Sequence, residues 1–395
     1  MLKKVFLGIF ALLSILSLEA LSRDAPIEPK PKTWYERLSF RGYAQLRYNR
    51  IGNSDRSLQS DQDRSIGDNS SFFLRRARLI LSGDVHDHLF IYLQPDFAAS
   101  VSGGGVSDAN HFAQLRDLYA DIAIDPEKEF RFRAGQSKVP YGFENLQSSQ
   151  NRVPLDRADA LNSGVPNERD IGVFFYWAPA EARARFKHLV DSGLKGSGDY
   201  GVLGAGVYNG QTVNRSELNN NRHFVARATY PWELAEGGQI IETGLQGYSG
   251  QFVPTKSGNV QGPRGFEDWR VGASLVVYPQ PLGFQAEYNL GRGPQLNAEQ
   301  TAVGDAPLRG GYAMVMYRFG SLIPFTRWQY YKGGRKGATN APAAKIQELE
   351  FGIEWQAYKF VELTAMYTFT DRTTTTSPFK NVKDDLARLQ LQVSF

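Results

Sequence analysis

The chain has 395 residues, of which 13% are aromatic, and it carries a net charge of +4 with no cysteine. A mean hydropathy of −0.39 excludes a bundle of membrane-spanning helices, which would be apolar overall. The absence of cysteine excludes disulfide bonds, so backbone pairing and side-chain packing must stabilise the fold.

The first 22 residues have the order of an export signal. Lys3 and Lys4 precede an apolar run, 5–18, which is too short to span a bilayer, and a small-residue site ends at Ser22. We therefore predict a signal peptide over 1–22, followed by a proline-containing periplasmic leader over 23–37. The alternative is a buried amino-terminal helix, which the charged-then-apolar order disfavours.

Beyond residue 37 apolar and polar residues alternate repeatedly, which is the period of a β-strand. In the last segment Leu389 and Leu391 share one face, whereas Gln390 and Gln392 share the other. About sixteen such segments occur. They cover 38–49, 72–82, 88–97, 113–123, 129–138, 169–177, 200–209, 222–230, 239–249, 268–278, 283–291, 311–319, 322–332, 346–356, 359–370 and 385–395.

The connections between these segments alternate in length. The long ones are 50–71, 98–112, 139–168, 250–267, 292–310, 333–345 and 371–384, and the short ones are 83–87, 125–128, 279–282, 320–321 and 357–358. Transmembrane β-barrels have long outer loops and short periplasmic turns. One turn, 178–199, is long, and we predict a short periplasmic helix there. We therefore predict an all-β fold over 38–395, a transmembrane antiparallel β-barrel of about sixteen strands.

The stretch Phe130-Arg131-Phe132-Arg133 shows how the two faces of such a barrel would be used. In a soluble sheet the phenylalanines would pack inward, whereas in a membrane barrel they face lipid and the arginines face the bore. The reverse orientation would place two arginines in lipid, at about 2–4 kcal/mol each near the midplane. The loop pattern favours the membrane arrangement, and sixteen strands leave an aqueous channel.

Five motifs and the terminal Phe395 stand out within this alternation. The motifs are FLRRARLILSGDV, LQPDFA, RFRAGQSKVPYGFENLQSS, RDIGVFF and GVYNG. Together they resemble the phosphate-selective porin O/P family of outer-membrane channels. The resemblance implies a trimeric barrel in the outer membrane of a Gram-negative-type cell, with loop 139–168 folded inward to constrict the bore. It also implies that a paired arginine, here Arg75 and Arg76, lines this constriction.

The chain departs from the phosphate-selecting members of this family at three places. They carry a lysine after the Gly-x-Glu of the inward loop, where this chain has Asn145. They carry an arginine in the first strand, where this chain has Tyr43, and their fifth outer loop is rich in arginine, whereas 250–267 offers only Lys256 and Arg264. The resemblance therefore implies a preference for anions, with phosphate-like anions among the candidate solutes.

Eight basic residues are candidates for a pore-lining anion site, because guanidinium groups bind phosphate-like anions through paired donors. Arg75 and Arg76 are adjacent, so either a β-bulge redirects one of them inward or one lies above the membrane band, at a solvated loop edge. The other candidates are Arg41, Arg47, Arg131 and Arg133, which face the bore by parity, and Lys138 and Arg152, which could reach the constriction from the start of the loop and from within it. Asp117 and Asp121 face the bore as well and would offset part of this charge.

The hypothesis from the sequence is a porin for passive diffusion of small hydrophilic solutes, with a preference for anions. The expected partners of such a porin are outer-membrane lipid, small anions as solutes and two further copies of the chain in a homotrimer. We expect no cofactor, metal or nucleic acid. His86 and His88 lie in a short turn, and two ligands are too few for a metal site. One alternative is an outer-membrane hydrolase barrel, which would need a Ser/His pair on its outer wall. Another is a binding or adhesion barrel, which would need a plug in its bore.

Overall fold

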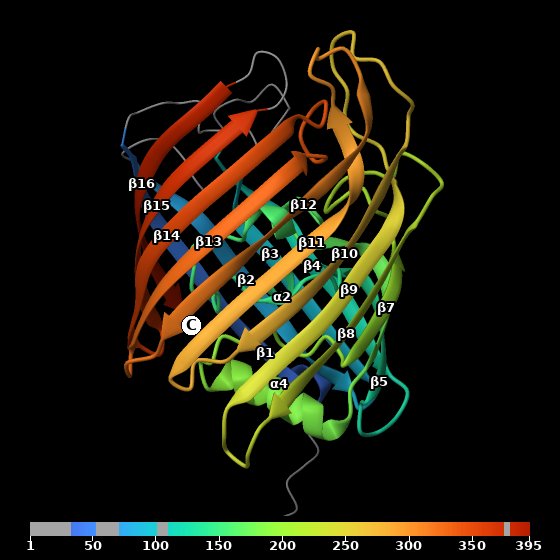
Figure 1. Ribbon diagram of the computed structural model, residues 1–395. Coiled ribbons are helices and arrows are strands. Elements are labelled where there is room, and N and C mark those ends of the chain that lie inside the picture. Colours follow the sequence, from blue (N-terminus) through green and yellow to red (C-terminus); the bar gives the residue numbers. More distant parts are fainter. Residues whose placement is uncertain (1–32, 53–70, 101–109, 375–379) are drawn as a thin grey trace, which may run out of the picture. The chain divides into compact units, whose positions relative to one another are not determined.

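A closed ladder of backbone hydrogen bonds organises the molecule. The computed structural model describes residues 33–52, 71–100, 110–374 and 380–395, and in these residues sixteen antiparallel strands form one closed barrel (Figure 1). Each strand pairs with its neighbours along the chain, and the last pairs with the first. The predicted fold class is confirmed. The predicted signal peptide, 1–22, lies outside the described residues, as does the leader up to residue 32.

Each of the sixteen predicted segments corresponds to one strand. The strands are β1 (Leu38–Ile51), β2 (Ser71–His86), β3 (Leu89–Ser100), β4 (Asn110–Ala123), β5 (Phe130–Lys138), β6 (Arg169–Trp177), β7 (Leu203–Tyr208), β8 (His223–Glu233), β9 (Ile240–Phe252), β10 (Phe266–Val277), β11 (Leu282–Leu296), β12 (Val303–Tyr317), β13 (Leu322–Gly334), β14 (Ala343–Tyr358), β15 (Val361–Thr374) and β16 (Lys380–Ser394). The helices are η1 (Trp34–Arg37), α2 (Phe143–Leu146), α3 (Asp159–Asn162) and α4 (Ala180–Asp191).

The largest departure from the predicted boundaries concerns 292–310, which was expected to be a loop. Instead β11 continues to Leu296 and β12 begins at Val303, and these two residues are paired. The pairing of the two strands satisfies the backbone of both, and it outweighs the weak strand propensity of Gly304 and Pro307. The strands on this side of the barrel are therefore longer than the alternation indicates.

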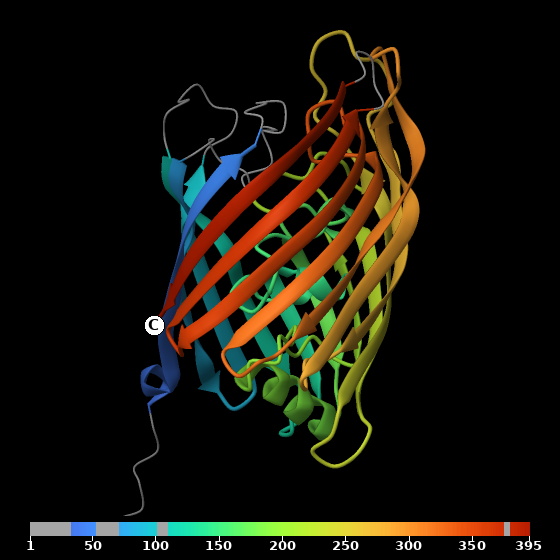
Figure 2. The same ribbon diagram turned by 60° about the vertical axis from the view of Figure 1, so that its left-hand side comes forward.

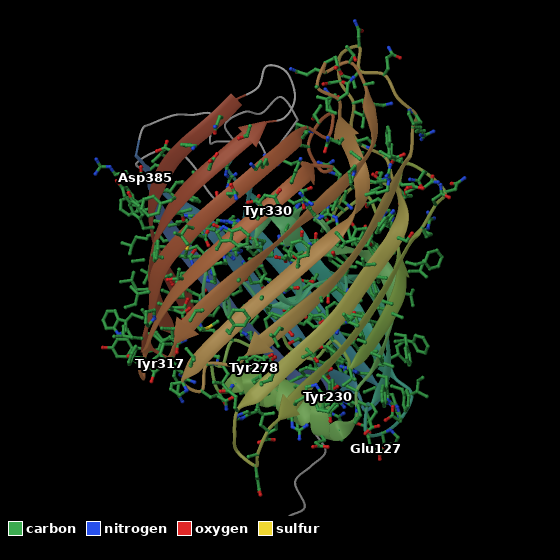
Figure 3. All side chains as sticks on the ribbon, viewed as in Figure 1. Glu127, Tyr230, Tyr278, Tyr317, Tyr330 and Asp385 are labelled. Carbon is green, nitrogen blue, oxygen red and sulfur yellow. The ribbon has the colours of Figure 1, made fainter. Side chains whose placement is uncertain are left out.

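The two faces of the wall differ as the membrane arrangement requires. Phe130 and Phe132 are 41% and 42% exposed on the outer surface, whereas Arg131 and Arg133 are buried inside. In the stretch 130–133 the phenylalanines therefore face lipid and the arginines face the bore. Figure 3 shows the side chains from one side of the barrel, with Tyr317 near its short-turn end.

The barrel closes where β1 meets β16, which lie side by side in Figure 2. Gly42 and Phe395 exchange two backbone hydrogen bonds of 2.8 and 2.9 Å at this seam. A Cβ atom at position 42 would lie 2.6 Å from the Phe395 ring and 2.6 Å from the Arg78 carbonyl oxygen. Only glycine allows this close approach of strand and terminal ring.

Two long connections pack against the barrel, one on its inner wall and the other at its short-turn end. Residues 139–168 contact the inner wall, where the Arg270 guanidinium donates to the Ala160 carbonyl at 3.0 Å. The turn predicted to contain a helix does contain one, α4, at the short-turn end (Figure 1). Phe186 and Leu189 of α4 are buried, and Arg185 pairs with Glu233 of β8 at 3.2 Å. Among the described residues, no helix is both long and apolar enough to cross a membrane.

We expect Leu245→Arg to impair assembly, because Leu245 lies near the middle of β9 and is 66% exposed on the outer wall. An arginine facing lipid at midplane depth should lower the free energy of unfolding by about 2–4 kcal/mol. Urea titration in phospholipid vesicles measures this loss. Leu245→Phe should change little, and Gln246→Glu, which faces the bore opposite Arg227, should still fold. Equal losses for the two charged variants would contradict the assigned faces.

Candidate functional site

A polar cavity of about 100 Å³ lies between loop 139–168 and the inner wall. It is lined by eight arginines and six carboxylates, together with neutral side chains. The arginines are Arg75, Arg76, Arg78, Arg116, Arg157, Arg327, Arg372 and Arg388, and the carboxylates are Asp96, Asp156, Asp159, Glu168, Glu348 and Glu350. The cavity is therefore the part of the bore in which basic residues from distant strands meet the loop.

Two β-bulges supply arginines to this cavity. Between β1 and β2 the register shifts so that Arg75 has no partner across the ladder, while Arg76 remains opposite Gln45. Between β3 and β4 a second shift leaves Arg116 without a partner in the same way, next to Asp117. A bulge changes the direction of one side chain, so adjacent residues can point into the bore together. Of the two alternatives for Arg75 and Arg76, the bulge is the one observed.

Three arginines converge on the carboxylate of Asp156, which belongs to the loop. Arg47 Nη1 lies 2.6 Å and Arg388 Nη1 3.1 Å from Asp156 Oδ2, and Arg75 Nη2 lies 3.2 Å from Oδ1. Burial alone would raise the pKa of Asp156, but these guanidinium groups hold its pKa well below the ordinary value of 3.8. The carboxylate is therefore charged throughout the physiological range.

Most of the other arginines in the cavity are neutralised by a neighbouring carboxylate. Arg78 pairs with Asp96 at 2.9 Å, and Arg372 pairs with Glu348 at 2.7 Å. The remaining pairs of this kind are Arg157 with Glu168, and Arg327 with both Glu144 and Glu350. Paired groups contribute little net positive potential to the bore, because each guanidinium lies against a negative charge.

Among the described residues, four buried arginines have no such partner: Arg270, which instead donates to the Ala160 and Ser163 carbonyls of the loop, and Arg76, Arg116 and Arg152. Arg76 donates to Gln45 Oε1 at 2.7 Å, and Arg116 donates to the Asn167 carbonyl at 3.2 Å, but no carboxylate of the described residues lies within 4 Å of either side chain. Arg152 is 4% exposed, and in the described part of the chain none of its three guanidinium nitrogens finds a hydrogen-bond acceptor. Arg152 lies close enough to Arg76 for the two charges to repel. Buried donors without partners favour the binding of an anion.

The other candidates from the sequence lie elsewhere. The Lys138 ammonium donates to the Leu146 and Gln147 carbonyls at 2.8 and 2.9 Å, so it holds the loop backbone. Arg41 is exposed and donates to Ser82 Oγ at 3.1 Å. Neither side chain lines the arginine-rich cavity.

Arg131 and Arg133 line a separate cavity near the short-turn end of the barrel. Arg131 pairs with Asp199 at 2.7 Å, and Arg133 pairs with Asp121 at 2.7 Å. The prediction that Asp121 faces the bore and offsets part of the positive charge is confirmed. The structure therefore brings Arg47, Arg75 and Arg76 together with the loop, and it keeps the arginines of β5 apart from them.

Several residues of the cavity were missed by reasoning from the sequence. Arg78 follows Arg76 by two positions and Arg388 lies on the polar face of β16, so alternation alone could have found both. Arg116 carries no such signal, because parity with its neighbour Asp117 predicts that it faces lipid. Asp156 lies in the loop, where no period applies. Within the described residues, no group of three His, Asp or Glu side chains is arranged to hold a metal ion.

A barrel with an apolar outer wall and a charged interior defines an outer-membrane channel protein of the porin class. Within this class, the chain belongs to the family of phosphate-selective porins O and P, whose model matches residues 45–395. The resemblance seen in the sequence motifs is thereby confirmed. The protein is an outer-membrane porin that forms a channel for small hydrophilic solutes.

Solved structures share the fold at low sequence identity. OmpF of Salmonella typhi in complex with daunomycin is 14% identical with a TM-score of 0.57, and 91% of this chain aligns with 97% of that chain. An anion-selective porin from Comamonas acidovorans is 11% identical, and the trimer form of OmpT from Vibrio cholerae is 10% identical. Both have a TM-score of 0.53 and align 91% of this chain with 99% of theirs. Comparison with curated protein sequences found no match.

The contribution of Asp156 to stability should depend on pH in a defined direction. Because its pKa is lowered in the folded state, the contribution is complete above the ordinary value of 3.8 and is lost as the pH falls toward the folded-state value. Asp156→Asn should lower the free energy of unfolding by about 1.5–3 kcal/mol at pH 7. The difference in melting temperature between wild type and variant should stay constant from pH 7 to 5 and shrink below 3.8. A difference that already shrinks between pH 7 and 5 would contradict the assignment.

Proposed function

We propose that this porin favours small hydrophilic anions, and that the arginine-rich cavity is its selective region. The observation that carries the proposal is the set of three buried arginines, Arg76, Arg116 and Arg152, that lack a carboxylate partner among the described residues. A solute anion would complete their hydrogen bonding as it passes. Loop 139–168 would form the constriction, since it brings Arg152 and Asp156 against the wall.

Selection by such a site depends on charge and on partial removal of solvent. In a narrow, partly dehydrated region a guanidinium attracts an anion more strongly than in water, and its planar donors match two oxygens of a phosphate-like group. The paired arginines and carboxylates around it keep the total field small. Binding would therefore be weak enough for release, as conduction requires.

The proposal agrees with the similarity in fold to the anion-selective porin of Comamonas acidovorans, although identity with that protein is only 11%. Anion preference is favoured over strict phosphate selection, because Asn145 and Tyr43 stand where phosphate-selecting relatives carry basic residues. Membership of a porin family favours a channel over the hydrolase or adhesion barrels that the sequence left open.

Arg76→Gln combined with Arg152→Gln should move the reversal potential in a KCl gradient toward cation permeation, because the first substitution removes unpaired charge from the cavity and the second removes it from the loop beside Arg76. The shift should be larger at low salt, since ions screen charges over about 10 Å at 0.1 M. Planar-bilayer recording of purified protein measures it. The control is Lys187→Gln, which removes one exposed charge from α4. Reversal potentials that are equal in wild type and the double variant would contradict the role of these arginines.

We also propose that the mature protein begins near Arg23 and assembles as a homotrimer. The sequence order of 1–22 supports the first claim, and the second agrees with the trimer form described for OmpT of Vibrio cholerae. Native mass spectrometry of protein extracted from outer membranes should show three copies, each lacking about the first 22 residues. A monomer, or a chain that begins at Met1, would contradict the corresponding claim.

A further inference from the structure

We infer that Asp156 is a tethered competitor for solute anions, because its carboxylate occupies the position in which Arg47, Arg75 and Arg388 would otherwise hold an anion of the pore. The inference rests on the proposed function and deepens it. It makes Asp156 a residue that determines selectivity: its charge masks a second anion site next to the one formed by the unpaired arginines.

The geometry around Asp156 is that of a bound anion. Three guanidinium groups from the neighbouring strands β1, β2 and β16 reach its two oxygens at 2.6–3.2 Å. These are the distances of charge-assisted hydrogen bonds, and two of the donors share Oδ2 while the third takes Oδ1. A phosphate, sulfate or carboxylate solute also presents anionic oxygens to guanidinium donors, so the same donors suit it.

The loop is held in place by many contacts besides this carboxylate. Arg47 Nη2 donates to the Leu155 carbonyl at 3.0 Å, and Arg327 Nη2 donates to the Asp156 carbonyl at 2.9 Å. Glu287 accepts from the backbone amides of Phe143 and Glu144, both at 2.7 Å. Loss of the Asp156 charge alone therefore leaves the loop attached on both sides, which separates its electrostatic role from a tethering role.

Tethering gives Asp156 an advantage over a free solute. A group attached to a short loop has an effective concentration in the millimolar range or above at its partner, so dilute solute anions rarely displace it. The arginines it occupies, Arg47, Arg75 and Arg388, are buried or nearly so, with side-chain exposures of 0%, 17% and 6%. If Asp156 were neutral, the donors that now bind its carboxylate would lose that charged acceptor, although Arg388 would keep Glu350 at 3.7 Å. The freed donors would then bind an anion from solution.

The test compares Asp156→Asn with Asp159→Asn. Asparagine keeps the size of the side chain and an acceptor oxygen, so the loop contact persists while the charge is lost. Asp159 lines the same cavity and belongs to the same loop, and it lies 3.8 Å from Arg372, a longer separation than any of the three around Asp156. Both variants therefore remove one negative charge from the cavity, and only the first releases three arginines.

Each channel would be recorded in planar bilayers under a KCl gradient and then with inorganic phosphate added. For Asp156→Asn we expect a larger increase in the anion-to-cation permeability ratio than for Asp159→Asn. We also expect half-block by phosphate at a roughly tenfold lower concentration than in wild type, since about 1.4 kcal/mol of new binding free energy has that effect.

Two outcomes would overturn the inference. Equal shifts in the two variants would mean that Asp156 acts only through the general field of the cavity. A severalfold rise in the conductance of Asp156→Asn with loss of selectivity would mean that the carboxylate serves only to tether the loop. The reversal potential of wild type is a separate measurement, since it tests the proposed anion preference whatever the variants do.

Discussion

Backbone hydrogen bonding in a lipid environment is the constraint on which the rest of this structure depends. Lipid offers no partner for an amide or carbonyl group, so every strand must be paired on both sides and the sheet must close. Closure joins β1 to β16, and the same seam sets Arg47 opposite Gln390 and Arg388 opposite Asn49. Two of the arginines that bind the loop are therefore neighbours because the barrel is closed.

Closure also fixes the parity of side chains, and the bulges are the places where parity is broken. A bulge is costly to a regular ladder, yet here two bulges flank β3, and each adds an arginine to the same cavity, Arg75 from β2 and Arg116 from β4. The bulged strands thus place more arginines around this cavity than a regular alternation of inward and outward side chains would allow. The carboxylates of the loop and of the opposite strands then neutralise most of it, which leaves a few unpaired donors.

The alternation of apolar and polar residues was sufficient to predict the strands, and to predict that Phe132 faces outward and Arg47 inward. In a barrel wall every second side chain faces the bore, so the sequence period also gives the side on which a residue lies. It did not predict the inward direction of Arg116, since a bulge depends on pairing with another strand and leaves no local period. Nor did it predict that the Lys138 ammonium binds loop carbonyls, or that Asp156 meets three arginines. Those contacts depend on the path of loop 139–168, which is determined by partners more than a hundred residues away in the sequence.

The course of loop 139–168 has a mechanical consequence as well. A sixteen-stranded wall around an open bore is a thin-walled tube, which lateral pressure from the bilayer would tend to flatten into an ellipse. The loop is bonded to β1 and β16 through Asp156 and to β10 and β13 through Ala160 and Glu144. It therefore connects walls on different sides of the barrel from within, so that flattening of the tube would have to break these contacts as well as bend the sheet.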